Sequence, residues 1–174
     1  MMRSQFVYVT MVLLVGQLVV PTDNAQAEEI SAHLTFHAGP VNGVVVGDRA
    51  ESVAVYSVPK SKMPSVSTVL LTEHRRDVVA AAIDGIAAEV KVVAPESEKD
   101  LFETPNAFWD EFWTKRFHDY AQQSTKILTE PLKVDRWVKE GDTLDSGGVT
   151  FQVLETPGFT RGAVSYVADI DGKR

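Results

Sequence analysis

Short segments rich in β-branched residues alternate with helix-type segments along this chain, and this alternation restricts the fold class more than any other feature. Four apolar runs bounded by Gly, Pro, Asp or Ser predict strands at residues 34–36, 43–46, 53–56 and 67–71. The alanine-rich segment 77–89 follows, with its apolar residues at the spacing of one helical face, and it predicts a helix. The four predicted strands are therefore followed by a helix.

The second half of the chain repeats strand and helix and then becomes wholly β. A strand is predicted at 90–94, stopped by Pro95, and a helix at 108–120. After Pro131 the predicted strands are 132–138, 143–144, 149–154 and 163–170, with turns at 140–142, 145–148 and 156–162. A strand–helix–strand–helix series implies sheets with helices on their faces, so the expected fold class is α/β.

Large aromatic side chains recur at helical spacing in the predicted helix 108–120. Such a stripe is more typical of the buried face of a helix than of a ligand platform, so we interpret it as core. The opposite face is charged and includes Asp110 and Glu111. The stripe consists of Phe108, Trp109, Phe112, Trp113, Phe117 and Tyr120.

Composition restricts the chemistry that the chain can perform. The sequence has 174 residues, a formal net charge of −7, 44% hydrophobic residues and no cysteine. These values are typical of one globular domain. Without cysteine, any metal would be held by His, Asp or Glu. An acidic chain without a basic patch is a poor partner for nucleic acid and for anionic membranes, which are bound mainly through Lys and Arg.

The N-terminus predicts export. Arg3 is the first charge, residues 6–20 form an apolar run of 15 residues, and Ala25 and Ala27 form a small-x-small cleavage site. The run is shorter than the roughly 20 apolar residues of a spanning helix. We expect a signal peptide at 1–27 that is cleaved after Ala27, rather than an uncleaved anchor or a buried first helix. The folded unit would be 28–174, secreted or periplasmic and not membrane-bound.

Two segments resemble motifs of the metallo-β-lactamase superfamily. Residues 70–77 read LLTEHRRD, where that superfamily has Thr-His-x-His-x-Asp-His after a strand. Residues 156–162 read TPGFTRG, where it has Thr-Pro-Gly-His-Thr-x-Gly. The resemblance covers roughly residues 36–174 and implies an αββα sandwich of mixed sheets flanked by helices. It also implies a hydrolase in which metal-activated water cleaves an ester, amide or phosphate bond.

The metal-ligand positions implied by this resemblance are largely replaced. The histidines of the first motif fall on Glu73, Arg75 and Val78, its aspartate falls on Asp77, and the histidine of the second motif falls on Phe159. Arg75 carries a fixed positive charge, and Val78 and Phe159 have no lone pair to offer a metal. We therefore expect no cofactor, or zinc only if the site is functional.

The four histidines offer few replacements for the missing ligands. His74 is one residue out of phase and could join Glu73 and Asp77 in a weak metal site, or be a surface or supporting histidine. Glu73, Arg75, Arg76 and Asp77 could instead form an ion-pair cluster. For Arg75 and Arg76, solvated surface charge is the favoured interpretation, and anion binding is an alternative without a second basic cluster to support it. His33 and His37, four residues apart on one predicted strand, would be about 13 Å apart and unable to share a metal. For His118 we expect no functional role.

The chain is expected to supply only the N-terminal half of the metallo-β-lactamase fold. Asp171-Gly172 predicts a hairpin turn, with only two residues after it. In the superfamily the chain would continue into a strand and a second β/α half. An exposed sheet edge and an unfilled apolar face would then require that missing C-terminal half or a protein partner.

Three functional hypotheses follow from the sequence. The first is an exported, non-catalytic binding or structural module that keeps the fold and has lost or impaired its zinc site, and this is the one that the ligand replacements favour. The second is an active metal-dependent hydrolase. The third is a truncated product without independent function. Whether the chain is an enzyme, and on which substrate, is not decided by the sequence.

Overall fold

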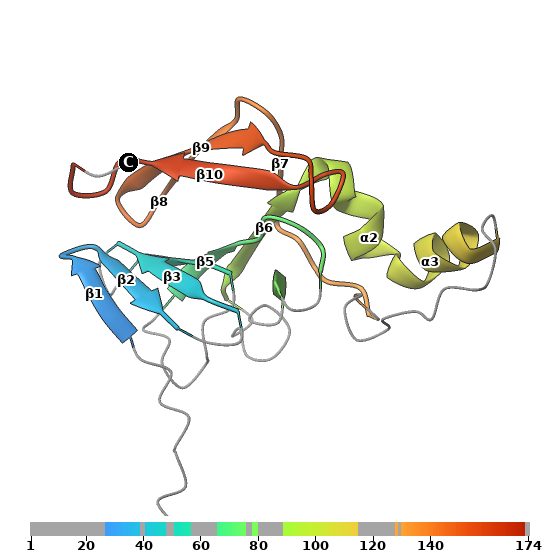
Figure 1. Cartoon of the computed structure of the whole chain (residues 1–174), viewed down its shortest axis with the longest axis horizontal. Helices are drawn as coiled ribbons and strands as arrows, with labels where there is room; N and C mark the ends of the chain where they lie inside the picture. Colours follow the sequence, from blue (N-terminus) through green and yellow to red (C-terminus); the bar gives the residue numbers. More distant parts are fainter. Residues whose placement is uncertain are drawn as a thin grey trace, which may run out of the picture.

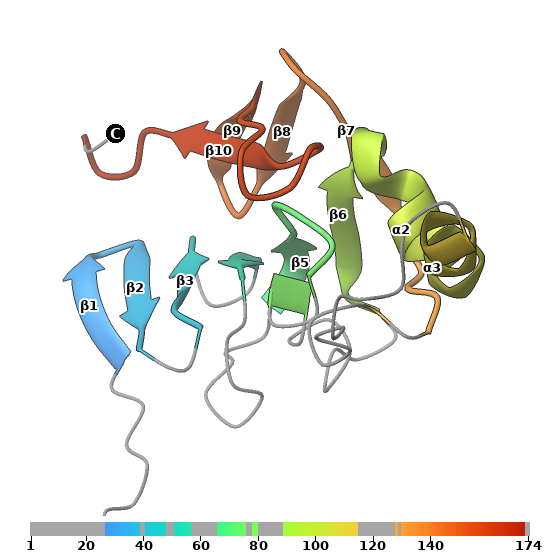
Figure 2. The same ribbon diagram turned by 45° about the vertical axis from the view of Figure 1, so that its right-hand side comes forward.

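Two stacked β-sheets form the framework of the molecule (Figures 1 and 2). The computed structural model describes residues 27–38, 41–47, 51–56, 66–75, 78–79, 89–114, 128 and 130–172. The larger sheet has seven strands in the order β1-β2-β3-β4-β5-β6-β7, and the smaller has three in the order β10-β9-β8. The predicted signal segment, apart from Ala27, lies outside the described residues.

The larger sheet is mixed. Its strands are β1 (Ala27–Ser31), β2 (Leu34–His37), β3 (Gly43–Val46), β4 (Ser52–Val55), β5 (Val66–Leu70), β6 (Lys91–Pro95) and β7 (Arg136–Val138). β1 to β4 form an antiparallel meander, whereas β4 to β7 pair in parallel. The smaller sheet is antiparallel and consists of β8 (Thr143–Ser146), β9 (Val149–Glu155) and β10 (Val164–Ala168).

Successive residues of the central strands point to two different cores. Val69 packs into the core on the helix side, together with Phe102, whereas Leu70 packs between the two sheets, together with Phe151 and Val164. Strands that are buried on both faces are continuously apolar, which explains the runs in β3, β4, β5 and β6. The layers are therefore helix, seven-stranded sheet and three-stranded sheet, in agreement with the expected α/β class.

Three short helical segments follow β6: the 3₁₀ turn η2 (Glu96–Glu98), α2 (Lys99–Glu103) and α3 (Pro105–Thr114). The first two were not predicted. α3 starts three residues earlier than expected because proline fits the first helical position. Phe108 and Trp109 of the aromatic stripe are half-buried and meet edge to face at 5.2 Å, and Asp110 and Glu111 are exposed. The rest of the stripe lies outside the described side chains.

Several predicted boundaries are corrected. β1 was missed, and it begins at Ala27 itself. The strand expected at 132–138 is only Arg136–Val138, because Leu132 donates its backbone N–H to Phe102 instead of to a neighbouring strand. The turn expected at 145–148 consists of Gly147 and Gly148, both at positive φ (61° and 73°), which is the two-residue hairpin geometry that favours glycine. The last strand is Val164–Ala168.

The tip of the β8–β9 hairpin explains how the two sheets approach each other so closely. A Cβ on Gly47, which follows β3, would lie 2.5 Å from the Gly147 carbonyl oxygen. Gly47 has φ +97°, another conformation that L side chains rarely adopt. The backbones therefore touch at this point, and Ser146 donates to the Thr68 hydroxyl of β5 at 3.2 Å beside it.

Apolar side chains on the surface bear on the expectation of an unfilled apolar face. The only large apolar side chains that are exposed within the described residues are Ile30 and Phe159. The face of the small sheet that points away from the core carries Thr150 and Gln152, both exposed. The half-buried apolar side chains of Leu154 and Val167 lie on the same face, so the expected unfilled apolar face stays a prediction. No helix in the described part is long and apolar enough to cross a bilayer.

Candidate functional site: two motif turns joined at one edge

The two motif segments lie side by side at one end of the sheets. The first leaves the end of β5 and the second precedes β10, so the parallel strand and the small sheet deliver them to the same edge. The Val164 backbone N–H donates to the Thr72 carbonyl at 3.0 Å, and the Tyr166 hydroxyl donates to the Leu71 carbonyl at 3.0 Å. Burial raises the pKa of the Tyr166 phenol, which keeps this donor protonated.

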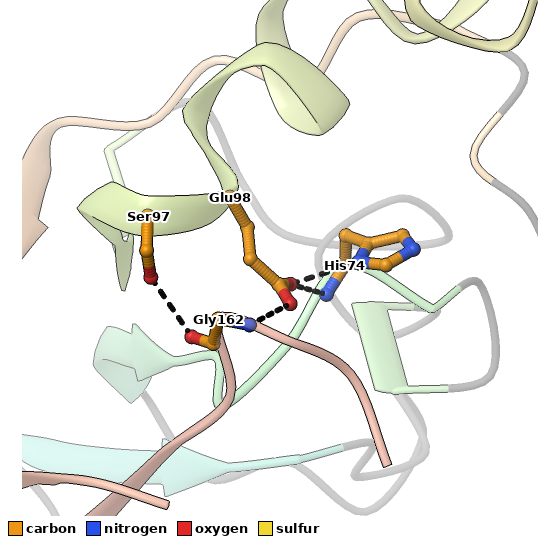
Figure 3. Close-up of polar contacts among 4 residues, drawn as sticks. All are labelled: His74, Ser97, Glu98 and Gly162. Atoms are coloured by element: carbon orange, nitrogen blue, oxygen red, sulfur yellow. Dashed lines mark hydrogen bonds and ion pairs between the residues drawn. The ribbon is translucent and has the colours of Figure 1, made fainter. Parts of the chain in front are cut away.

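Glu98 holds the two turns together (Figure 3). One carboxylate oxygen accepts the His74 backbone N–H at 2.6 Å and contacts His74 Nδ1 at 2.8 Å. The other oxygen accepts the Gly162 backbone N–H at 3.2 Å. Ser97 adds a hydrogen bond from its hydroxyl to the Gly162 carbonyl at 3.1 Å. One buried carboxylate from η2 thus bonds to both motifs.

The electrostatics of this clamp favour the ionised carboxylate. Burial alone would raise the pKa of Glu98, which is 3% exposed, but the hydrogen bonds that the carboxylate accepts, first from His74 and then from Thr160, outweigh burial and lower that pKa below its ordinary value. An ionised carboxylate only accepts hydrogen bonds, so His74 Nδ1 carries the hydrogen in this contact. The His74 ring is consequently held in one orientation.

Arg75 and Phe159 meet where the two turns converge. The Arg75 guanidinium carbon lies 4.0 Å from the centre of the Phe159 ring, a cation–π contact. Arg75 is half-buried, whereas Phe159 is 71% exposed. Both residues occupy positions at which the superfamily motifs have histidines. The structure therefore brings these two motif positions together, with a guanidinium and a phenyl ring in place of two imidazoles.

The other motif positions are placed differently. Glu73 is buried, with 7% of its surface exposed, and Val78 is helical and 6% exposed. Asp77 and Arg76 lie outside the described residues, so the hypothesis of an ion-pair cluster of all four charged side chains stays a prediction. Arg75 contacts Phe159 at the convergence of the two motif turns, which we call the rim.

The histidines also differ from expectation. His74 is not a surface residue: it is 9% exposed, bonded to Glu98 and 6.2 Å from the Trp109 ring. His33 lies in the turn before β2 rather than on a strand with His37. Its Nδ1 contacts the Asp171 carboxylate at 2.6 Å. Ser31 and His33 lower the pKa of Asp171 to about 2. His118 lies outside the described residues.

Three of the motif positions have no side chain that could bind zinc. Zinc in proteins is held by three or four nitrogen, sulfur or oxygen ligands. At the motif positions, Arg75, Val78 and Phe159 supply none, and the Nδ1 of His74 is already bonded to Glu98. Within the described part of the chain, no three His, Asp or Glu side chains are grouped so that they could hold a metal ion.

Known structures share this arrangement of sheets and helices. The fold matches BJP-1, a subclass B3 metallo-β-lactamase of Bradyrhizobium japonicum, with a TM-score of 0.62 and 18% identity over 85% of this chain and 58% of that one. The chain has the metallo-β-lactamase fold. Native FEZ-1 metallo-β-lactamase from Legionella gormanii matches with a TM-score of 0.60 and 15% identity over 84% of this chain and 60% of that one.

Two further comparisons bear on the motifs. A Cronobacter sakazakii metallo-β-lactamase described by its HARLDQ motif matches the fold with a TM-score of 0.63 and 15% identity, over 85% of this chain and 59% of that one. Hydroxyacylglutathione hydrolase from Hahella chejuensis is 38% identical over 55 residues, which are 32% of this chain and 19% of that protein. No protein-family model matches the sequence.

The chain spans only part of each of these relatives. It covers 58–60% of the three lactamase structures, which agrees with the expectation of a partial metallo-β-lactamase fold. The described helices and sheets correspond to one helix layer and two sheets of the αββα sandwich.

Sequence reasoning missed Glu98, the residue that joins the two motifs. Glu96 and Glu98 both follow Pro95 in the same 3₁₀ turn, and one is exposed whereas the other is 3% exposed. A single turn has no repeating pattern that separates its buried from its exposed side. The only local signal is the strand-ending Pro95, which places the turn at the edge where the motifs meet.

Proposed function

We propose that this protein is an exported, non-catalytic member of the metallohydrolase lineage, in which protein groups replace the zinc centre as the connection between the two motif turns. The observation that supports it is the Arg75–Phe159 contact at the convergence of the motifs. A guanidinium is always charged and has no lone pair, so it repels a metal ion and cannot bind one. Without a bound metal, water is not activated for hydrolysis in the way this fold family uses.

Metal analysis of the purified, zinc-exposed protein tests this proposal. We expect clearly less than one zinc per chain, because fewer than three ligands are present at the motif positions. A variant in which Glu73, Arg75, Val78 and Phe159 are all replaced by histidine should gain at least one zinc. Adding Asp77→Ala to that variant should weaken its zinc binding about 10-fold or more, since a ligand is lost.

Stoichiometric zinc in the wild-type protein that is lost in Asp77→Ala would contradict the proposal. The quadruple histidine variant serves as the positive control, because it shows that the assay detects zinc at this rim when ligands are present. Its circular dichroism spectrum should match that of the wild type, so that a failure to bind zinc is not confused with a failure to fold.

A metal-dependent hydrolase is the second candidate, and one observation favours it. The motif His-Ala-Arg-Leu-Asp-Gln of the Cronobacter lactamase has arginine and aspartate two residues apart, as Arg75 and Asp77 are here. An arginine at this position is thus found in a protein named as a metallo-β-lactamase. Zinc-dependent turnover of a chromogenic β-lactam or an acylglutathione thioester, abolished by Asp77→Ala, would favour this candidate.

Export is part of the proposal and rests on the apolar run 6–20 and the Ala25-x-Ala27 site. Expressed in full in a bacterium with two membranes, the protein should be recovered outside the cytoplasm with Glu28 as its first residue. Mass spectrometry of the intact product measures this. Replacing Ala27 with arginine should block cleavage and leave the full-length mass, whereas Gln26→Arg, at the unrestricted middle position, is the matched control. A wild-type product that retains Met1 would contradict the export proposal.

A further inference from the structure

We propose that the Arg75–Phe159 pair is a binding site for a small organic carboxylate, with the guanidinium pairing with the carboxylate and the exposed ring contacting the apolar part of the ligand. This inference rests on the proposed function, because a metal at the convergence of the motifs would displace the guanidinium. It goes beyond that function by naming the chemical class that the rim recognises.

The two side chains come from turns that are fixed by buried contacts. Glu98 bonds to His74, the residue before Arg75, and to Gly162, three residues after Phe159. Val164 N–H bonds to Thr72 on the same edge. A site whose parts are already held in place loses little conformational freedom when a ligand binds, which favours binding by even a few groups.

The chemistry of the pair suits a carboxylate. A guanidinium presents five N–H donors in a planar fork that matches the two oxygens of a carboxylate. Because it has five donors, a further contact of Arg75 within the protein leaves others for a ligand. The Phe159 ring, whose centre lies 4.0 Å from the guanidinium carbon, holds the charged group on one side, and a hydrogen bond between two charged groups is stronger than one between neutral groups.

The surroundings distinguish this rim from the rest of the surface. The protein is acidic overall, with a net charge of −7, yet Arg161 stands exposed two residues after Phe159 in the same turn. Phe159 is far more exposed than Ile30, the other exposed large apolar side chain of the described residues. An aromatic ring at 71% exposure in contact with the Arg75 guanidinium offers an anion both charge and apolar surface.

Titration of the EDTA-treated protein with benzoate, followed by ¹H–¹⁵N NMR, tests the inference. We expect the amide signals of residues 159–162 to shift and to saturate in the millimolar range. Benzamide, which has the same ring without the charge, should cause no saturating shift. Acetate, which has the charge without the ring, should bind several-fold more weakly than benzoate. Inorganic phosphate separates carboxylate recognition from general anion binding and should bind more weakly than benzoate.

Variants of the pair assign the roles. Arg75→Gln should weaken benzoate binding at least 10-fold, and Arg75→Lys, which keeps the charge but not the fork, by about 3- to 10-fold. Phe159→Leu should weaken benzoate binding more than acetate binding. Arg136→Gln is the matched control, since Arg136 is an exposed arginine on β7 that bonds to the Thr143 carbonyl, and it should leave the titration unchanged.

Several outcomes would overturn the inference: no shifts with benzoate in the folded protein, equal weakening by Arg136→Gln, or tighter binding of phosphate than of benzoate. The NMR spectrum itself reports whether each variant is folded. Failure of this inference is distinguishable from failure of the proposed function. If no zinc binds and no benzoate binds, only the carboxylate site is wrong, whereas stoichiometric zinc overturns both.

Discussion

Replacing Gly162 with alanine is expected to destabilise the protein by about 3 kcal/mol, because the new Cβ has no room. It would collide with Cγ of Glu98, and it would lie 2.6 Å from Ser97 Oγ and 3.1 Å from Ser97 Cβ. Side chains in η2 cannot simply move aside, since Glu98 is bonded to both motif turns and Ser97 to the Gly162 carbonyl. The substitution therefore forces the two turns apart.

Chemical denaturation of the two proteins measures the effect, and a thermal melt should show a midpoint lowered by roughly 10 °C. Gly158→Ala is the matched control. It is the same substitution in the same turn, but a Cβ at Gly158 meets nothing within 4 Å and its φ is not in the left-handed region. We expect its free energy of unfolding to stay within about 0.5 kcal/mol of the wild type. Equal loss in the two variants would show that the turn is sensitive to alanine in general and that the contact with η2 is unimportant.

The central strands could be predicted from the sequence because burial on both faces leaves an unambiguous pattern. β3 was predicted at the residues it occupies, and β4, β5 and β6 within one residue at each end. Continuous β-branched runs between turn residues have few other structures to adopt. Residues 156–162, which resemble a Thr-Pro-Gly motif, lie next to residues 72–74, because Gly162 bonds to Glu98 and Val164 bonds to Thr72.

Elements whose stability comes from distant parts of the chain could not be predicted in this way. β1 carries Glu28 and Glu29, both exposed, and among the described strands it pairs with β2 alone, at the edge of the sheet. Charged residues on an edge strand prevent association with other chains, but they also remove the apolar alternation that reveals a strand. Residues 132–135 looked like a strand but bond to α2 and β6 as a connection, which depends on where those elements lie.

The sequence predicted the site as motif positions that lack metal ligands. The structure adds that the side chains at two of these positions, Arg75 and Phe159, contact each other. The resemblance implied that Arg75 and Phe159 occupy motif positions, but not that they touch, because the two residues are far apart in the sequence. His74 was considered as a metal ligand or a surface residue. Its buried bond to Glu98 could not be inferred, since the partner comes from a single 3₁₀ turn without a recognisable pattern.

Replacing Glu98 with alanine is expected to lower the free energy of unfolding by about 4 kcal/mol at pH 7. The carboxylate accepts hydrogen bonds from two backbone N–H groups and from the His74 ring, and alanine would leave these donors without a partner in a buried place. Each buried donor without a partner costs about 1–3 kcal/mol. Because Glu98 contacts both motif turns, we also expect the amide signals of residues 72–75 and 159–162 to move together in this variant.

Glutamine at position 98 separates the charge of the carboxylate from its shape. Glu98→Gln keeps one acceptor oxygen but turns an NH₂ group toward one of the N–H donors. We therefore expect its free energy of unfolding to be about 2 kcal/mol below that of the wild type, a smaller decrease than in Glu98→Ala. Glu96→Gln is the matched control, because Glu96 lies in the same turn and is exposed, and it should change the free energy of unfolding by less than about 0.5 kcal/mol.

The stability that the Glu98 carboxylate contributes decreases as the pH falls. The folded protein lowers the pKa of Glu98, chiefly because the His74 contacts outweigh burial, so the carboxylate contributes stability above the ordinary carboxyl pKa. That stability is lost as the pH falls through the lower, folded-state pKa. The difference in free energy of unfolding between wild type and Glu98→Gln should thus be present at neutral pH and shrink in acid. A difference that grows in acid would mean that the neutral carboxyl, and not the carboxylate, holds the two turns together.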